Sequence, residues 1–163
     1  MPAALTPLTP QDRKEVIDIF NGHVLGGFAA YPETPVPYEF YDLLLKAVGD
    51  HPTVAARAET GELLGYGFLR PWHPLPAFAA TAEVTYFLKP TATRQGLGTR
   101  MLARLEEEAR ALGITSILAN VSSLNEASRQ FHLKRGFVEC GRFVGVGRKL
   151  GRVFDTVWLQ KRL

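Results

Sequence analysis

The segment at 83–101, EVTYFLKPTATRQGLGTRM, has the residue types and spacing that most clearly indicate a binding site. An apolar strand leads into a Gly-Leu-Gly turn at 96–98, and an amphipathic helix follows. Glycines let the backbone approach an anion closely, and the first turn of a helix points unpaired N–H groups and the positive end of its dipole at the same place. Arg94 and Arg100 add positive charge on either side. The pattern predicts a phosphate-bearing cofactor, and a tight turn that only starts a helix is the simpler alternative.

Two common phosphate-binding motifs do not fit this turn. A dinucleotide fingerprint needs a third glycine or alanine three residues after the second, where this chain has Met101. A P-loop needs Gly-Lys followed by Ser or Thr, and no such triplet follows. Dinucleotide and nucleoside-triphosphate binding are therefore not expected.

The spacing instead resembles the acetyl-CoA signature of the GNAT family of N-acetyltransferases, Gln/Arg-x-x-Gly-x-Gly/Ala, with Gly96 and Gly98 at the glycine positions. Thr93 stands where that signature has glutamine or arginine, and Arg94 can supply the missing charge. The backbone cradle itself needs no particular side chain. The resemblance implies acetyl-CoA as the cofactor, with CoA as the product.

Three further segments extend the resemblance over nearly the whole chain and narrow it to one subfamily. They are similar to blocks of the phosphinothricin and methionine sulfone acetyltransferases, and they occur in the same order and at the same spacing. These segments are GYGFLRPWHPLPAFAATAEVTYFL at 65–88, NEASRQFHLKRGF at 125–137 and GRKLGRVFDTVWLQ at 147–160.

The hydrophobic periods and turn residues predict an alternating chain of strands and helices. Its order, strand, two helices, three strands, helix, strand, helix and two strands, is the order expected of the GNAT family. The resemblance implies an α/β (α+β) acyl-CoA N-acyltransferase fold, with a mostly antiparallel sheet, one splayed parallel strand pair within 83–121, and helices on both faces. The expected helices are 9–22, 38–48, 98–113 and 125–136, and the expected strands are 53–58, 63–69, 83–88, 114–121, 137–145 and 152–160.

Length and composition favour a single N-acetyltransferase domain over 1–163. With 163 residues, 46% of them apolar, the chain can bury about 70% of the surface of its unfolded form. No apolar run spans a bilayer and no signal-peptide order begins the chain, so a cytoplasmic protein without membrane contact is expected. The net charge of +3 is spread along the chain and does not indicate nucleic-acid binding. The lone Cys140 and four scattered histidines give no disulfide and no expected metal site.

Glu83 is the candidate general base. Acetyl transfer from a thioester needs a neutral amine, and a carboxylate can take the proton from the ammonium directly or through water. Within six positions on either side, Lys89 is the only basic residue, so we expect an isolated carboxylate whose loss of hydration favours proton uptake. An exposed charge at a strand end is the alternative, and the match to the Thr-x-Glu of the subfamily favours the base.

His132 is the candidate general acid toward the departing thiolate. It stands four residues before Gly136, where the subfamily has histidine and the wider family usually has tyrosine. Its ordinary pKa near 6.5 allows proton exchange at neutral pH. A packed core histidine beside Phe131 is the alternative, and Leu133 replaces the glutamate that usually follows in the subfamily.

The resemblance also implies which residues contact acetyl-CoA. The strand before the turn would pair with the pantetheine amides through its backbone, and one of its N–H groups would polarise the thioester carbonyl. Asn125 would face the cofactor in addition to capping a helix. The expected set is Tyr86, Phe87, Leu88, Arg94, Gln95, Gly96, Leu97, Gly98, Thr99 and Asn125.

The substrate side departs from the subfamily. Leu75 occupies the place of an arginine that can meet the acid group of an amino-acid substrate, so substrates with a second anionic group are less expected. Phe28, Tyr31, Trp72 and Phe78 could line an apolar or aromatic amine pocket with it, and loop anchoring in the core is the alternative. The proline-rich segments 26–37 and 71–76 favour a closed pocket.

The sequence therefore predicts an acetyl-CoA-dependent N-acetyltransferase in which a small, amino-acid-like primary amine attacks the thioester directly. Two alternatives stay open. One is acetylation of a protein N-terminus or lysine, and the other is a non-catalytic acyl-CoA-binding regulatory module. The expected partner is a small-molecule amine, and a homodimer is the expected assembly.

Overall fold

A computed structural model describes residues 2–163 of the protein, and its strands form one seven-stranded sheet in the order β1-β2-β3-β4-β5-β7-β6. Every neighbouring pair is antiparallel except β4 and β5. The predicted mixed sheet with one parallel pair is thereby confirmed. The strands are β1 (Ala4–Thr6), β2 (Thr53–Arg57), β3 (Leu63–Pro71), β4 (Thr81–Leu88), β5 (Ser116–Ser122), β6 (Val138–Lys149) and β7 (Arg152–Arg162).

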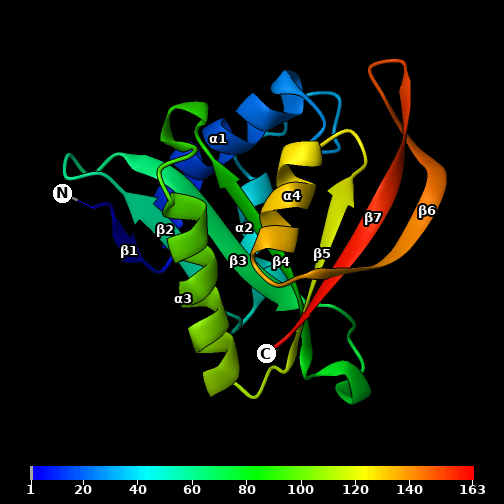
Figure 1. Ribbon diagram of the computed structural model, residues 1–163. Coiled ribbons are helices and arrows are strands. Elements are labelled where there is room, and N and C mark those ends of the chain that lie inside the picture. The colour runs from blue at the N-terminus through cyan, green and yellow to red at the C-terminus, as the bar shows by residue number, and fades with distance from the viewer. Residues whose placement is uncertain (1) are drawn as a thin grey trace.

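Helices cover both faces of the sheet, as predicted (Figure 1). Helices α3 and α4 lie on one face, and α1 and α2 lie on the other. Each face has its own apolar cluster, and side chains along β4 alternate between the two. The helices are α1 (Arg13–Gly26), α2 (Phe40–Val48), α3 (Leu97–Ala111) and α4 (Glu126–Lys134), and short 3₁₀ turns occupy Pro10–Asp12, Pro76–Phe78 and Pro90–Ala92. None of the helices within 2–163 is long and apolar enough to cross a membrane.

Helix α1 is longer than the sequence predicted. The chain enters it through the turn at Pro10, where Asp12 Oδ2 accepts a hydrogen bond of 2.7 Å from Thr9 N. We expected the helix to stop near Gly22, but it continues to Gly26. Val24 in the added turn is buried, and this tertiary packing outweighs the low helix propensity of glycine.

Strands β4 and β5 separate after a short stretch of pairing. They pair only from Thr81 to Glu83, opposite Ser116 to Leu118. Strand β4 stays paired with β3 up to Leu88, so beyond Glu83 its other edge is free. This is the splayed parallel pair that the sequence predicted, and it opens the sheet beside the glycine turn at 96–98.

The final hairpin extends four residues further along β6 than predicted. Its turn consists of Leu150 and Gly151, which both have positive φ angles, 50° and 74°, as a tight two-residue hairpin turn requires. A Cβ at Gly147 would lie 2.2 Å from the Phe154 ring, so only glycine allows the strands to pack there. The hairpin carries the end of β6 toward the loop that follows α1.

Candidate active site

The turn before α3 forms an open anion cradle. Gly96 has φ of 75° and stands at the helix start with no side chain to cap it. The first backbone bond of the helix runs from Arg100 N to Gly96 O at 3.1 Å, so the N–H groups of residues 97–99 have no partner within the helix. Leu97 is buried in the core, so its side chain anchors the turn and its backbone remains for a ligand. These N–H groups and the helix dipole favour a pyrophosphate at this position.

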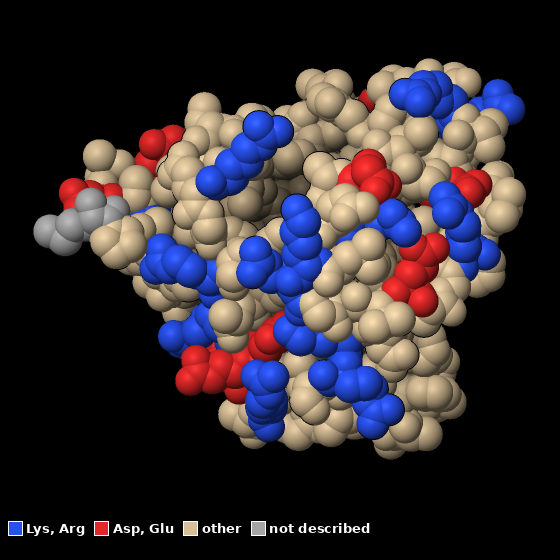
Figure 2. Space-filling view, viewed as in Figure 1, with Lys and Arg blue, Asp and Glu red and all other residues tan. Residues whose placement is uncertain are grey.

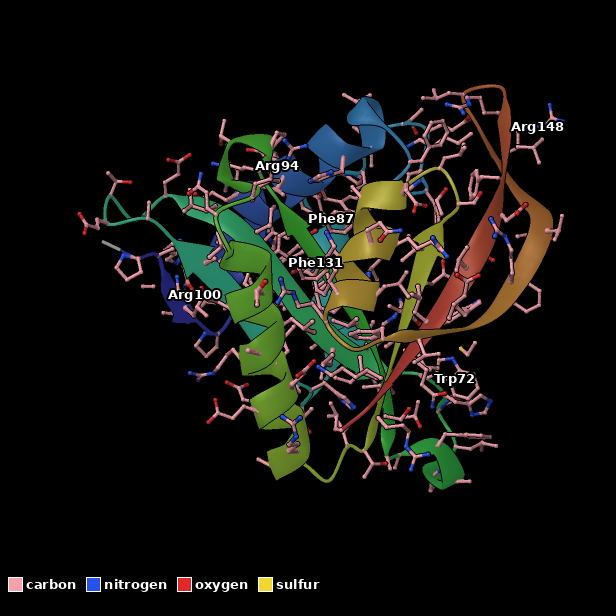
Figure 3. The ribbon with its side chains drawn as sticks, viewed as in Figure 1. Trp72, Phe87, Arg94, Arg100, Phe131 and Arg148 are labelled. Atoms are coloured by element: carbon pink, nitrogen blue, oxygen red, sulfur yellow. The ribbon has the colours of Figure 1, made fainter. Side chains whose placement is uncertain are left out.

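The two arginines beside the cradle lie differently. Arg94 is exposed, has a positive φ of 62°, and stands at the rim of a hollow between the cradle and α4 (Figures 2 and 3). Arg100 points toward β1, where its Nη2 donates a 2.7 Å hydrogen bond to Ala3 O. Arg94 is therefore better placed than Arg100 to meet an anion, and its predicted cofactor contact stays a prediction.

A pocket of about 610 Å³ lies at the end of β4, between α1 and the start of α4. Asn125 lines it and also caps α4, because its Oδ1 accepts a 3.3 Å hydrogen bond from Ser128 N. His23 lines it too, and its Nε2 is 2.7 Å from Leu88 O. The predicted helix cap is confirmed, and the predicted cofactor contact of Asn125 stays a prediction.

The free edge of β4 supplies backbone groups to the splay. In an antiparallel pair, alternate residues bond to the partner strand. Lys89 N donates to Leu64 O at 2.8 Å, so the odd-numbered residues of β4 face β3. Of the three residues expected to offer backbone groups, Tyr86 and Leu88 face the splay. The backbone of Phe87 is used by β3, which corrects that expectation.

Glu83 lies where β4 leaves β5, and it has a cationic partner. Arg70 is opposite Glu83 in the β3–β4 register, and its Nη2 is 3.0 Å from Glu83 Oε1. The Glu83 side chain is 14% exposed and that of Arg70 is 43% exposed. The expectation of an isolated carboxylate is therefore wrong, because the end of β3 pairs with β4 and places Arg70 beside Glu83. The base role of Glu83 stays a prediction.

Tyr31 and Asn120 complete the surroundings of Glu83 on the α1/α2 face. The Tyr31 hydroxyl donates to Asn120 Oδ1, and its ring stacks on Phe154 at 5.5 Å. Burial, together with the negative charge of Glu83, raises the pKa of Tyr31 to about 12. Tyr31 is thus a neutral hydrogen-bond donor at physiological pH, near the candidate base.

His132 is buried, 3% exposed, and both of its ring nitrogens are occupied. Its Nδ1 is 2.7 Å from Ser128 O, so Nδ1 carries the proton and Nε2 accepts from the Tyr86 hydroxyl. Burial lowers the pKa of His132 and raises that of Tyr86 well above its usual value. Both groups are therefore neutral near pH 7. Tyr86 is the side chain that contacts His132 Nε2, and the general-acid role of His132 stays a prediction.

The five residues predicted to line the amine pocket fall into two clusters. Phe28 and Tyr31 contact the Phe154 ring, on the side of Glu83. Trp72 and Phe78 pack on each other at 5.4 Å in the β3–β4 connection, and Figure 3 shows Trp72 on the opposite side of the molecule from Arg94. Leu75 is exposed in the same connection. The sequence did not distinguish these clusters, and the role of the five residues in binding an amine stays a prediction.

Lys149 holds the loop that carries Phe28 and Tyr31. Its side chain is fully buried, and Nζ donates to the carbonyls of Val24, Gly27 and Ala30 at 2.6–2.7 Å. All three ammonium protons are therefore used. Sequence reasoning noticed this lysine only as part of a motif, because burial of a lysine depends on carbonyls that lie more than a hundred residues away.

Comparison with known proteins agrees with this geometry. Residues 16–137 match the model of the Acetyltransferase (GNAT) family. The chain belongs to the GNAT acetyltransferase family. It is an N-acetyltransferase, and the resemblance noted in the sequence is confirmed.

Three proteins illustrate the likeness. The L-methionine sulfoximine/L-methionine sulfone acetyltransferase of Pseudomonas aeruginosa is 31% identical, over 100% of this chain and 96% of its own. The structure of a phosphinothricin acetyltransferase from Sinorhizobium meliloti in complex with AcCoA has a TM-score of 0.93 at 29% identity, covering 100% of this chain and 89% of that one. A ribosomal-protein-alanine N-acetyltransferase from Brucella melitensis has a TM-score of 0.90 at 31% identity, covering 98% of this chain and 99% of that one.

Acetyl-CoA is the cofactor of this family, and the residues present fit it. The uncapped start of α3 with Arg94 suits the pyrophosphate. The pocket and the free edge of β4 beyond Glu83 suit an amide-containing arm. An added Cβ at Gly98 would lie 3.5 Å from Leu88 and 3.6 Å from Phe131, so a side chain larger than alanine would crowd the space between the start of α3 and β4.

Proposed function

We propose that this enzyme transfers the acetyl group of acetyl-CoA to the primary amine of a small, amino-acid-like substrate by direct attack on the thioester. The observation that carries the proposal is the position of Glu83. Its carboxylate lies on the α1/α2 face at the point where β4 and β5 separate. The cofactor cradle and the pocket lie beyond the other end of the same strand segment. A base and a cofactor site thus share one strand, at its two ends.

Bound acetyl-CoA supplies an activated acetyl thioester. Glu83 accepts a proton from the substrate ammonium, directly or through one water, and frees the nitrogen lone pair for attack. A C–N bond to the acetyl carbon forms, the C–S bond breaks, and the second proton lost by the nitrogen balances the one that the leaving thiolate takes up. The backbone N–H groups of Tyr86 and Leu88 face the splay and can stabilise the developing negative charge on the carbonyl oxygen.

We propose that Tyr86 and His132 together position the groups around the leaving sulfur. The phenol of Tyr86 stays protonated because burial raises its pKa, so it can donate a hydrogen bond. His132 accepts from this phenol while Ser128 fixes the ring through Nδ1. His132 is thus proposed to position Tyr86, in addition to its predicted part in proton transfer.

A small substrate is favoured over a protein by the loop after α1. Lys149 attaches this loop to the end of β6, and Glu33 accepts a 2.7 Å hydrogen bond from Leu150 N. Tyr31 reaches from the loop to Asn120 on β5, and it lies close enough to Glu83 to feel its charge. The names of the Pseudomonas and Sinorhizobium proteins also refer to amino-acid-like substrates. Protein acetylation is the second candidate, because one similar structure is named for a ribosomal-protein substrate.

A substrate panel tests the proposal. Release of free CoA thiol is measured with acetyl-CoA and single amino acids, amino-acid amides, simple amines and peptides with a free N-terminal alanine. We expect turnover with at least one small amine and little with peptides, with the acetylated nitrogen identified by mass spectrometry. Turnover with peptides alone would support the protein substrate, and acetyl-CoA binding without any turnover would support the non-catalytic module.

Two further expectations from the sequence stay proposals. A homodimer is favoured by the edge strand β6, which leaves Phe143, Val144 and Val146 exposed next to an unpaired strand edge. A cytoplasmic location and a single domain over 1–163 are also proposed, and both rest on composition and on the family resemblance.

A further inference from the structure

We propose that Arg70 binds the α-carboxylate of the substrate and makes the enzyme selective for α-amino acids over amines that lack a carboxylate. The inference rests on the proposed function and names the group that selects its substrate. At position 75, where the similar subfamily has an arginine that can meet the acid group of its substrate, this chain has leucine. The structure offers an arginine from a different strand, beside the candidate base.

Arg70 shares a face and a register position with Glu83. Tyr66 and Phe68 on β3 belong to the α1/α2 cluster, so strand alternation puts Arg70 on that face as well. Arg70 and Glu83 are directly opposite each other, with 3.0 Å between Nη2 and Oε1. Both side chains arise from paired strands in the middle of the sheet, and this gives the pair a fixed backbone frame.

The guanidinium of Arg70 has N–H donors that its contact with Glu83 does not use. It has five N–H donors, and the contact with Glu83 is the one hydrogen bond that Arg70 makes among residues 2–163. Its side chain is 43% exposed, whereas that of Glu83 is 14% exposed. The free donors of Arg70 therefore reach solvent next to the more enclosed carboxylate. An incoming carboxylate can bind them without displacing Glu83.

An α-amino acid matches this ion pair in charge and in size. Its ammonium and carboxylate are joined through one carbon, so they are a few ångströms apart, as are the Arg70 and Glu83 charges. With the ammonium on Glu83 and the carboxylate on Arg70, each charge meets its opposite. Charge-assisted contacts to arginine are among the stronger hydrogen bonds in proteins, and they are often bidentate with carboxylates. An amide or a simple amine offers Arg70 no negative charge.

A purely structural role for the pair predicts a different result. Ion pairs with this much exposure contribute little to stability, so loss of Arg70 should leave the fold intact. Arg142 offers a matched control, because it pairs with Asp155 at 2.8 Å and its side chain is 44% exposed. That pair lies on the β6–β7 hairpin and touches no residue assigned to the site.

The test compares each of several L-amino acids with its own α-amide, using wild type, Arg70→Gln, Arg70→Lys and Arg142→Gln. We expect wild type to prefer the acid. Arg70→Gln should lower kcat/KM for the acid by about ten- to a hundredfold, mainly through KM, and leave the amide within about twofold. Arg70→Lys should retain part of the preference, and Arg142→Gln should behave as wild type.

Three outcomes would overturn the inference or separate it from the proposed function. Equal losses for acid and amide in Arg70→Gln would mean that Arg70 acts only on Glu83. A wild type that uses amides as well as acids would exclude an α-carboxylate anchor. If no amine is acetylated, the proposed function fails, and calorimetry of the amino acids with the CoA complex then decides: binding lost in Arg70→Gln supports the anchor, and unchanged binding refutes it.

Discussion

Tyr86 and His132 show how a single buried contact links catalysis to stability. The phenol donates to Nε2, and Ser128 O receives the proton on Nδ1, so the imidazole has its hydrogen-bonding needs met only in its neutral form. Protonation would place a second donor against the phenol in a buried position. The neighbours of His132 therefore favour its neutral form in this arrangement, and its general-acid role stays a prediction.

This arrangement predicts a stability that falls in acid. Burial lowers the pKa of His132 in the folded state below its ordinary value near 6.5. As the pH falls below 6.5, the unfolded chain binds the proton first, so the contribution is complete above 6.5 and is lost as the pH falls toward the folded pKa. Urea unfolding between pH 7.5 and 5 should show a slope of up to about 1.4 kcal/mol per pH unit from this group. His132→Gln should have a flatter profile, and an equally steep one would assign the slope to other groups.

At the scale of elements, the start of α3 is the feature on which we expect cofactor binding to depend. Its glycines differ in what they do. Gly96 supplies a backbone conformation with positive φ, whereas Gly98 supplies space between the helix, Leu88 and Phe131. Substitution at Gly98 should therefore affect the ligand more than the fold.

Gly98→Val is expected to weaken acetyl-CoA binding at least tenfold, because its methyl groups project into the passage toward Leu88 and Phe131. Gly113→Ala is a matched control at the other end of the helix, where φ is 77° and a Cβ meets nothing within 4 Å. It should cost about 1 kcal/mol of unfolding free energy and leave cofactor affinity unchanged. Isothermal calorimetry and thermal unfolding of both variants measure the two effects. Wild-type affinity in Gly98→Val would argue against the cradle.

The elements differ in how far the sequence predicts them. Periodicity and glycine spacing predicted the order of elements and the α3 turn, because both depend on local residues, and the family resemblance implied the splayed parallel pair. The partner of Glu83 could not be predicted, because the connection 72–80 has two prolines and no turn rule that fixes the β3–β4 register. Lys149 was missed for a related reason: its acceptors on α1 and the following loop come into reach only when the whole sheet has formed.

For the whole molecule, the central feature is a sheet that opens between β4 and β5 with different groups on either side (Figure 1). Tyr86, His132 and the α3 cradle belong to the face covered by α3 and α4. Glu83, with Arg70, belongs to the face covered by α1 and α2. We therefore expect the cofactor to bind mainly from one face and the amine to lose its proton on the other.

This separation gives the most direct test, which measures acetyl transfer and acetyl-CoA affinity in the same Glu83→Gln variant. Glutamine keeps the size of the side chain but cannot accept the proton, so turnover should fall about a hundredfold or more while the Kd for acetyl-CoA stays at the wild-type value. Thermal unfolding confirms that the variant is folded. Wild-type turnover in Glu83→Gln, measured with a substrate that the wild type acetylates, would contradict the account and leave Glu83 as the partner of Arg70 alone.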